Sequence, residues 1–320
     1  MEKIGKQVLV SIIAGVLIYF LLSIYGDINP VISSIGIFHW YLIPVLLSLS
    51  LINYSIRFLK WNYYLKLLDI KAGNKLSASI FFSGLVMSVT PMKAGELLKC
   101  FLLKQTLGVP VSKTVPVIFA ERVTDFLSLI FIAAIGGIVF NYGMVFVGLV
   151  ALFFAGIVLL ISSRNACYRI FSLAEKIPIV KKYSQKLYNL YESSYLMFRI
   201  KPLFLMILNG LFSWFFECLG FFLILNAFSP DITLFKSSFI YAFSTIFGAV
   251  TMLPGGLGAT EGSLTYLIIQ NGLSKENAIA GTLIVRMVTL WFAVLLGMIS
   301  LYMFQKKFGR IINNEQNKEL

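Results

Sequence analysis

Charged side chains are scarce in this sequence of 320 residues, where Asp, Glu, Lys and Arg account for 13% of the positions. A soluble domain carries about a quarter. His39 is the single histidine, and Cys100, Cys167 and Cys218 are widely separated and form no CxxC pair. These shortages argue against a soluble domain, a disulfide framework, a metal site and a His-based catalytic centre. We therefore expect no metal and no cofactor.

The chain is rich in apolar residues, which make up 58% of it, and its formal net charge is +13. The basic residues lie mainly between and after the apolar runs, which indicates a topology signal and a lipid surface rather than nucleic-acid binding. Because about 20 apolar residues cross a bilayer as a helix, we expect one all-α polytopic membrane domain over residues 1–320. The six convincing full spans are 8–25, 42–60, 114–141, 144–163, 203–227 and 277–304.

The first apolar run is expected to be an uncleaved helix. Lys3 and Lys6 precede it, but no small-residue cleavage site follows it. Residues 26–30 have the composition of a turn instead.

Two further apolar stretches, 76–106 and 235–271, are interrupted near their middles by proline and glycine. Non-helical backbone persists at membrane depth only where protein buries it or where it lines a wet cavity. We therefore predict that each stretch is a re-entrant or broken helical hairpin.

The distribution of basic residues predicts the orientation. If both broken stretches are hairpins, one face of the membrane receives 21 of the 27 Lys and Arg residues, and the other face receives only Lys236 and Lys275. The positive-inside rule then places both termini in the cytoplasm of a cell whose plasma membrane holds the chain. Residues 164–202 form a basic cytoplasmic connector, which we expect to lie near lipid headgroups; a docking site for a partner is the alternative.

The two broken stretches belong to an apparent internal repeat, with one half at about 42–141 and the other at about 203–305. Pro91 precedes Arg122 by 31 residues, and Pro254 precedes Arg286 by 32. Since the first hairpin starts from the cytoplasm and the second from outside, the repeat is inverted. Inverted repeats with broken helices at the midplane are typical of secondary transporters.

Several ionisable residues fall inside the expected membrane segments, where each isolated charge costs about 2.5–3.5 kcal/mol. They must be paired, hydrated or neutralised. They are Lys93, Glu96, Lys99, Glu121, Arg122, Asp125, Glu217, Glu261 and Arg286. In one interpretation Arg122 and Arg286 bind a lipid phosphate together. In the other they form structural ion pairs, Arg122 with Asp125 or Glu96, and Arg286 with Glu261. Glu121 and Asp125 share one helix face at a spacing of four residues, and Arg122 and Asp125 are neighbours at a spacing of three.

The broken loops offer a second way to hold an anion, because helix N-termini favour phosphate and carboxylate groups. Thr90 is a good N-cap before Pro91, and Thr260 can cap the helix that carries Glu261. The glycines that would let the backbone approach a ligand, or let the hairpins cross closely, are Gly255, Gly256 and Gly258.

Three other polar residues could have either a functional or a purely structural role. Glu217 shares a helix face with Ser213 and Asn209; it either carries a proton or pairs with arginine, or makes an interhelical hydrogen bond. Arg57 and Lys60, near the cytoplasmic end of the second span, are expected to extend their heads toward the interface; headgroup entry is the alternative.

Three short motifs resemble the lysylphosphatidylglycerol synthase transmembrane family. They are P-G-G-L-G-x-x-E at 254–261, P-x-K-x-G-E at 91–96 and E-R-x-x-D at 121–125. The resemblance covers about residues 8–305 and is to the flippase-like membrane domain of multiple peptide resistance factor proteins. It implies a lipid-translocating domain of two related halves. Larger members add a soluble synthase domain, which we expect this chain to lack, since it ends soon after its last span.

Taken together, these features predict a flippase or transporter for a lipid with an anionic, phosphate-bearing headgroup, working by alternating access and not as an enzyme. Without a GxxxxGK[ST] run, coupling would be to protons or another gradient. An intramembrane lipid-modifying enzyme is a weaker alternative because no nucleophile–base pair or acidic metal cluster is evident. A membrane adaptor is the third, although a scaffold needs no buried charges. A homo-oligomer is compatible with the sequence.

Overall fold

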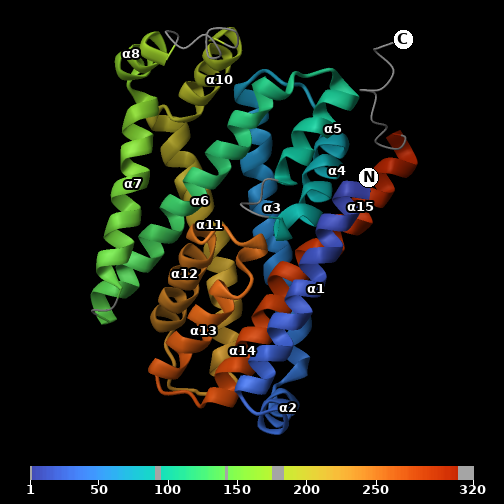
Figure 1. Ribbon diagram of the computed structural model, residues 1–320, viewed down its shortest axis with the longest axis vertical. Helices are drawn as coiled ribbons and strands as arrows, with labels where there is room; N and C mark the ends of the chain where they lie inside the picture. The colour runs from blue at the N-terminus through green and yellow to red at the C-terminus, as the bar shows by residue number, and fades with distance from the viewer. Residues whose placement is uncertain (1, 91–94, 141–142, 175–183, 309–320) are drawn as a thin grey trace.

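The computed structural model describes residues 2–90, 95–140, 143–174 and 184–308, and it is nearly all-helical there. The long helices are α1 (Glu2–Tyr25), α3 (Ile43–Leu67), α6 (Val111–Phe140), α7 (Met144–Ser162), α11 (Ile200–Asn226) and the continuous run of α14 (Lys275–Arg286), η5 (Met287–Trp291) and α15 (Phe292–Phe308). They pack lengthwise into an elongated bundle (Figure 1).

Among the described residues, four helical runs are long and apolar enough to cross a membrane: Trp40–Leu67, Met144–Ser162, Ile200–Asn226 and Lys275–Phe308. A fifth is the bent pair of Ile13–Tyr25 with Ile28–Ile37. The 30-residue α6 has the length of a span but carries Glu121, Arg122 and Asp125. The prediction of a polytopic helical membrane protein is therefore confirmed, with four or five candidate spans.

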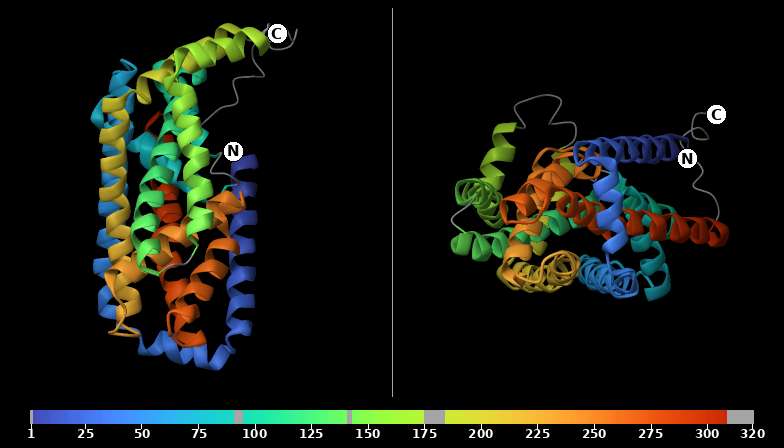
Figure 2. Two further views of the ribbon diagram at one scale, coloured as in Figure 1. Left: turned by 90° about the vertical axis from the view of Figure 1, so that its left-hand side faces the viewer. Right: turned by 90° about the horizontal axis from the view of Figure 1, so that it is seen from below.

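The bend after α1 is tighter than the expected turn at 26–30. The chain turns by 101° at Gly26 and Asp27, and α2 (Ile28–Ile37) begins at once. Pro30 lies in the first turn of α2, where its missing N–H costs little because these groups have no intrahelical partner. The helix α2 consequently lies across one end of the bundle (Figure 2).

Both interrupted stretches are broken into helix pairs, as predicted. The first consists of α4 (Asn74–Gly84), the short turn η2 (Leu85–Val89) and α5 (Leu98–Leu107). The second consists of α12 (Leu234–Val250), η4 (Pro254–Gly256) and α13 (Ala259–Gln270). They occupy opposite halves of the bundle (Figure 1).

The inner ends of the two hairpins meet in the middle of the bundle. The turns η2 and η4 are in contact. A side chain added at Gly255 would have its Cβ 3.3 Å from the Cα of Val89, and Gly255 itself has a φ of 60°, which favours glycine. Val89 and Leu257 share a small buried apolar cluster with Leu290 and Val294. Protein therefore covers the non-helical backbone where the two turns touch, while Met252 and Leu253 beside η4 are exposed.

The helix after the second hairpin widens into the π-helical segment η5, directly after Arg286. Side chains of α3 bond to carbonyl oxygens of this segment. Ser50 Oγ donates to the Val288 oxygen at 2.7 Å, and the Tyr54 hydroxyl donates to the Thr289 oxygen at 2.6 Å. These bonds join α3 to the wall of the bundle that carries Arg286.

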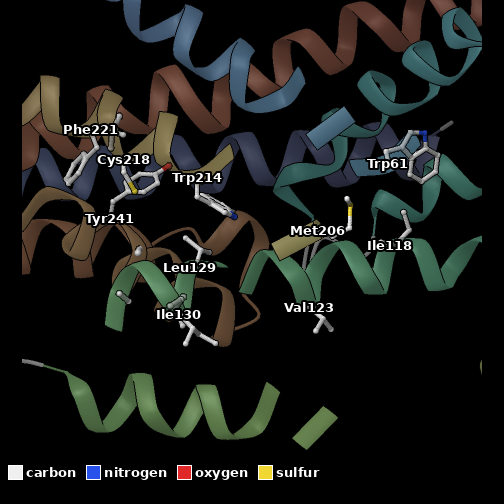
Figure 3. Close-up of a cluster of buried hydrophobic side chains, with 14 of the residues drawn as sticks. Trp61, Ile118, Val123, Leu129, Ile130, Met206, Trp214, Cys218, Phe221 and Tyr241 are labelled. Carbon is white, nitrogen blue, oxygen red and sulfur yellow. The ribbon is translucent and has the colours of Figure 1, made fainter. Parts of the chain in front are cut away.

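The main hydrophobic core lies between α3, α6 and α11, and Figure 3 shows part of it, including Val123, Leu129 and Ile130 from α6 and Cys218 and Phe221 from α11. Polar bonds cross the same contact: Asn53 Nδ2 donates to Ser213 Oγ at 2.8 Å, and Asn209 Nδ2 donates to the Ile56 oxygen at 3.2 Å.

The basic connector contains α8 (Arg164–Ala174) and α10 (Ser184–Met197), and its remainder lies partly outside the described residues. Glu192 joins the two helices, because its carboxylate accepts from Arg164 at 3.0 Å and from the Tyr168 hydroxyl at 2.5 Å. This hydrogen bond raises the pKa of Tyr168, and burial raises the pKa of Tyr191 to about 12. Both phenols therefore stay neutral at physiological pH.

A glycine at the crossing of α15 and η2 offers a test of this packing. A Cβ added at Gly297 would collide with the backbone of Val86, whereas one added at Gly148 in α7 would meet nothing within 4 Å. Gly297→Ala should destabilise the protein by about 1–3 kcal/mol through overpacking. Gly148→Ala should be neutral or slightly stabilising, because alanine favours a helix interior. Melting temperatures of the purified variants in detergent would compare them; equal values would show that α15 does not cross η2 this closely.

Candidate functional site

Buried charges of the first half surround Asp125 on α6, which is 3% exposed. Lys60 Nζ donates to Asp125 Oδ1 at 2.8 Å. The guanidinium nitrogens of Arg57 and Arg122 lie 3.6 and 3.5 Å from Asp125 Oδ2. Lys60 is 1% exposed, so the expectation that it extends toward the interface is wrong: its ammonium is held inward by Asp125 and by Thr124 Oγ1 at 3.2 Å.

Lys99 on α5 is the second centre of this network. Its Nζ lies 2.6 Å from Glu121 Oε2 and 3.7 Å from Glu96 Oε2. The same ammonium lies 4.7 Å from the ring centre of Trp61 and 5.2 Å from that of Phe81. Two carboxylates and two aromatic faces thus compensate one buried cation.

Arg122 connects the two centres. Its Nη2 is 3.1 Å from Glu96 Oε2, in addition to its contact with Asp125. Both structural partners predicted for Arg122 from the sequence are therefore present. Lys93, the remaining interior cation predicted in this half, lies outside the described residues.

The second half repeats this pairing of a hairpin glutamate with an arginine of the following helix. Arg286 Nε donates to Glu261 Oε1 at 2.6 Å, and Nη2 donates to the Gly255 carbonyl oxygen at 2.7 Å. The predicted pair of Arg286 with Glu261 is confirmed. Glu261 is fully buried.

The cap of α13 differs from the expected one. Glu261 Oε2 accepts from the backbone N–H of Gly258, at 2.7 Å, and so satisfies a donor at the start of the helix. Gly258 is the residue before the helix, and its φ is 85°. Thr260 lies inside α13, so the prediction that Thr260 caps this helix is wrong.

Thr90 ends the short turn η2. Its Oγ1 accepts from the Gly95 N–H at 2.9 Å and donates to the Met87 oxygen at 2.7 Å. The predicted helix start at Pro91, which Thr90 was expected to cap, falls outside the described residues.

A cavity of about 110 Å³ lies where the hairpin tips meet α3, α11 and α14. Its charged lining residues are Arg57, Glu217 and Arg286. Gly255, Gly256 and Thr260 also line it, so three of the four loop residues singled out from the 255–260 sequence reach this space. Arg122 is not among the lining residues, and the arginine that accompanies Arg286 at the cavity is Arg57.

Glu217 stands on the wall that α11 and α12 form. Its Oε2 accepts from the Tyr241 hydroxyl at 2.6 Å, and it is 7% exposed. This bond is an interhelical hydrogen bond, which was one of the alternatives that the sequence offered for Glu217. The sequence reasoning missed Arg57, Tyr54 and Tyr241 as cavity residues. Arg57 was expected to extend toward the interface because it lies near the cytoplasmic end of its span, but it lines the cavity instead. The two tyrosines belong to no motif that would have pointed to them.

The charges of this interior balance within the part of the chain that the structure describes. The cations are Arg57, Lys60, Lys99, Arg122 and Arg286, and the carboxylates are Glu96, Glu121, Asp125, Glu217 and Glu261. Chemically, the cavity offers two guanidinium groups, which bind phosphate or carboxylate oxygens through paired N–H donors.

Comparison with known proteins gives a family match along most of the chain. The family described as "Lysylphosphatidylglycerol synthase TM region" matches residues 7–297. A UPF0104 membrane protein of Methanothermobacter thermautotrophicus is 23% identical over 316 residues, which cover 89% of this chain and 90% of that protein. The UPF0104 membrane protein MJ1078 of Methanocaldococcus jannaschii is 21% identical over 231 residues, which cover 72% of this chain and 99% of that protein.

The buried ion pairs can be tested with Lys99→Met, which removes the cation from Glu121. Both side chains are about 5% exposed. Breaking such a pair from one side costs about 3–5 kcal/mol, because a buried charge is left uncompensated. The double variant Lys99→Met/Glu121→Gln should recover most of this loss. Thermal unfolding in detergent, arranged as a double-mutant cycle, measures both effects.

The control is Arg164→Met, since the side chains of Arg164 and Glu192 are 46% and 41% exposed. Exposed pairs contribute about 0–1 kcal/mol. Equal losses for the interior and the exposed pair would mean that Lys99 is not held by its buried partners.

Proposed function

This chain belongs to the lysylphosphatidylglycerol synthase TM region family, and from that premise we propose that it transports a lipid with an anionic, phosphate-bearing headgroup across the membrane. The family match covers residues 7–297, and the helices fit a multi-pass membrane protein. The observation that carries the proposal is the cavity at mid-bundle, into which Arg57 and Arg286 bring guanidinium groups from different halves of the chain.

Alternating access through an inverted repeat accounts for the arrangement of the hairpins. In this proposal the full architecture is six spans and two re-entrant hairpins. The helix before each hairpin packs against its counterpart, α3 on α11. The first hairpin packs through α4 on α15, the last helix of the second half, while α12 packs on α6, the last helix of the first half. A two-fold relation between the halves requires this exchange of partners.

In this proposal, two ion pairs close the transport path, one on each side of the cavity. Arg286 is held by Glu261 at 2.6 Å, and Arg57 faces Asp125 at a longer 3.6 Å. A phosphate that enters the cavity competes with these carboxylates for the same guanidinium groups. Displacing Glu261 would loosen the second hairpin, and displacing Asp125 would loosen the contact of α3 with α6, so one half could open while the other stays closed, which is the requirement of alternating access.

The same proposal makes the chain a transporter in the cell membrane and not an enzyme, with both termini in the cytoplasm and a membrane lipid as its partner. The described interior carboxylates lie beside cations or a tyrosine hydroxyl, an arrangement that suits charge compensation and exchange. The basic connector would then face anionic lipid headgroups on the cytoplasmic side.

A liposome assay tests the transport. The full chain is reconstituted with fluorescent lipids, and quenching of the outer leaflet reports their crossing. Crossing of phosphate-bearing lipids should fall about tenfold or more in Arg57→Ala and Arg286→Ala, because each removes a charged hydrogen-bond donor worth about 1.5–3 kcal/mol. Glu261→Gln should also slow it, since α13 loses its charged cap and Arg286 its partner.

Arg164→Ala, in the exposed pair with Glu192, is the matched arginine control and should cross lipids at the parent rate. Absence of crossing for every lipid by the folded parent protein, or unchanged rates in both cavity variants, would refute the proposed function.

Cysteine labelling tests the orientation. Single cysteines in place of Lys236 and Lys275 should react with an impermeant maleimide added outside intact cells, and one in place of Lys71 should react only after permeabilisation. The native cysteines are buried, so they can stay in place, and the parent protein without an added cysteine should show little labelling. The reverse labelling pattern would place both termini outside.

A further inference from the structure

The central cavity is small compared with sites that enclose a whole ligand. Its volume is about 110 Å³, whereas a site that encloses a small molecule measures about 300–1,000 Å³. In this conformation the cavity itself therefore has space for one small group, and the rest of a headgroup would lie outside it. A terminal phosphate needs space on one side only, because a single ester oxygen leads out to the lipid. A phosphodiester in the same place needs space on two sides.

The lining of the cavity combines donors with one carboxylate. Arg286 uses Nε and Nη2 in its bonds to Glu261 and Gly255, which leaves further N–H groups of its fork for an anion. Arg57 reaches the cavity beside its 3.6 Å contact with Asp125. Glu217 lines the cavity from α11, where Tyr241 already donates to Oε2.

A carboxylate in a phosphate site favours a ligand that brings a proton of its own. An ionised phosphodiester has only acceptor oxygens, and these would face the acceptor oxygens of Glu217. A phosphate monoester in its singly charged form carries a P–OH group that can donate to Glu217, while its other oxygens accept from the two arginines. An ionised carboxylate has about four lone-pair positions and can accept from several donors at once.

We infer that the cavity selects a lipid phosphate monoester, with Arg57 and Arg286 binding the phosphate oxygens and Glu217 accepting a hydrogen bond from its P–OH group. This inference rests on the proposed lipid transport and specifies its substrate class. Glu217 is the specificity-determining residue, because it accepts a hydrogen bond that a monoester can donate through P–OH and an ionised diester cannot donate. Figure 3 shows the rings of Trp214 and Tyr241 that accompany Glu217 on this wall.

Binding to the full-length protein in detergent tests the inference apart from transport. The probes are short-chain phosphatidic acid as the monoester, short-chain phosphatidylglycerol as the diester, short-chain phosphatidylethanolamine, and inorganic phosphate. Their dissociation constants are obtained from ligand-induced thermal stabilisation. Phosphatidic acid should bind about tenfold or more tightly than phosphatidylglycerol, the ratio expected from one hydrogen bond to a charged group.

Glu217→Gln is the diagnostic variant. Its amide N–H can donate to a diester oxygen, so the preference should fall to about threefold or less, mainly through tighter binding of phosphatidylglycerol. Glu192→Gln, which changes an exposed glutamate of the connector, should keep the parent preference. Retention of the preference in Glu217→Gln would remove Glu217 from the selection.

Three other results would overturn the inference. Equal binding of the two anionic lipids by the parent protein would show that phosphate esterification is not recognised. Tightest binding of phosphatidylethanolamine, lost in Glu217→Gln, would show that Glu217 pairs with a headgroup ammonium. Inorganic phosphate binding as tightly as phosphatidic acid would identify a free phosphate site. Selective binding without lipid crossing would support the phosphate monoester site and refute transport. Lipid crossing without selective binding would support transport and refute the monoester site.

Discussion

The cost of an uncompensated charge inside a membrane constrains the whole interior of this protein. Insertion scales put it at about 2.5–3.5 kcal/mol for each charged side chain at the centre of a span. Lys60, Lys99 and Arg286 are accordingly held by carboxylates at 2.6 to 2.8 Å. Each of these pairs joins different helices or a hairpin to a helix, so charge compensation also fixes the positions of α3, α5, α6, α13 and α14 relative to one another.

Buried backbone groups of the second hairpin also need partners, and the charged side chains supply some of them. Glu261 accepts from the Gly258 N–H, and Arg286 donates to the Gly255 carbonyl oxygen, so the charged pair also satisfies part of the irregular backbone between α12 and α13. The side chains of Ser50 and Tyr54 do the same for carbonyl groups of the π-helical segment after Arg286. An anion that rearranges the pair would therefore also disturb the backbone of the hairpin, which is how a small ligand can move a helix.

The cavity lies where the charged network of the first half meets the ion pair of the second half. Arg57 belongs to the network around Asp125, Arg286 belongs to the pair with Glu261, and both line the same space with Glu217. A ligand there contacts both halves at once. In the proposed transport, a cavity at the meeting of the hairpin tips would serve as the central site, because it would lie behind either hairpin as seen from the opposite side of the membrane.

The sequence by itself determined the membrane class and the two interrupted stretches, and it offered the pairing of a hairpin glutamate with an arginine in each half as one of two interpretations. These features depend on local composition and on spacing along single helices, which the order of residues specifies. Only the tertiary structure decided that Arg57, and not Arg122, accompanies Arg286 at the cavity, and that Lys60 points inward to Asp125. It also decided that Glu261, and not Thr260, caps α13. Each of these outcomes depends on which side chains the packing of distant elements brings together. A buried charged group turns toward the partner that lies within hydrogen-bonding distance.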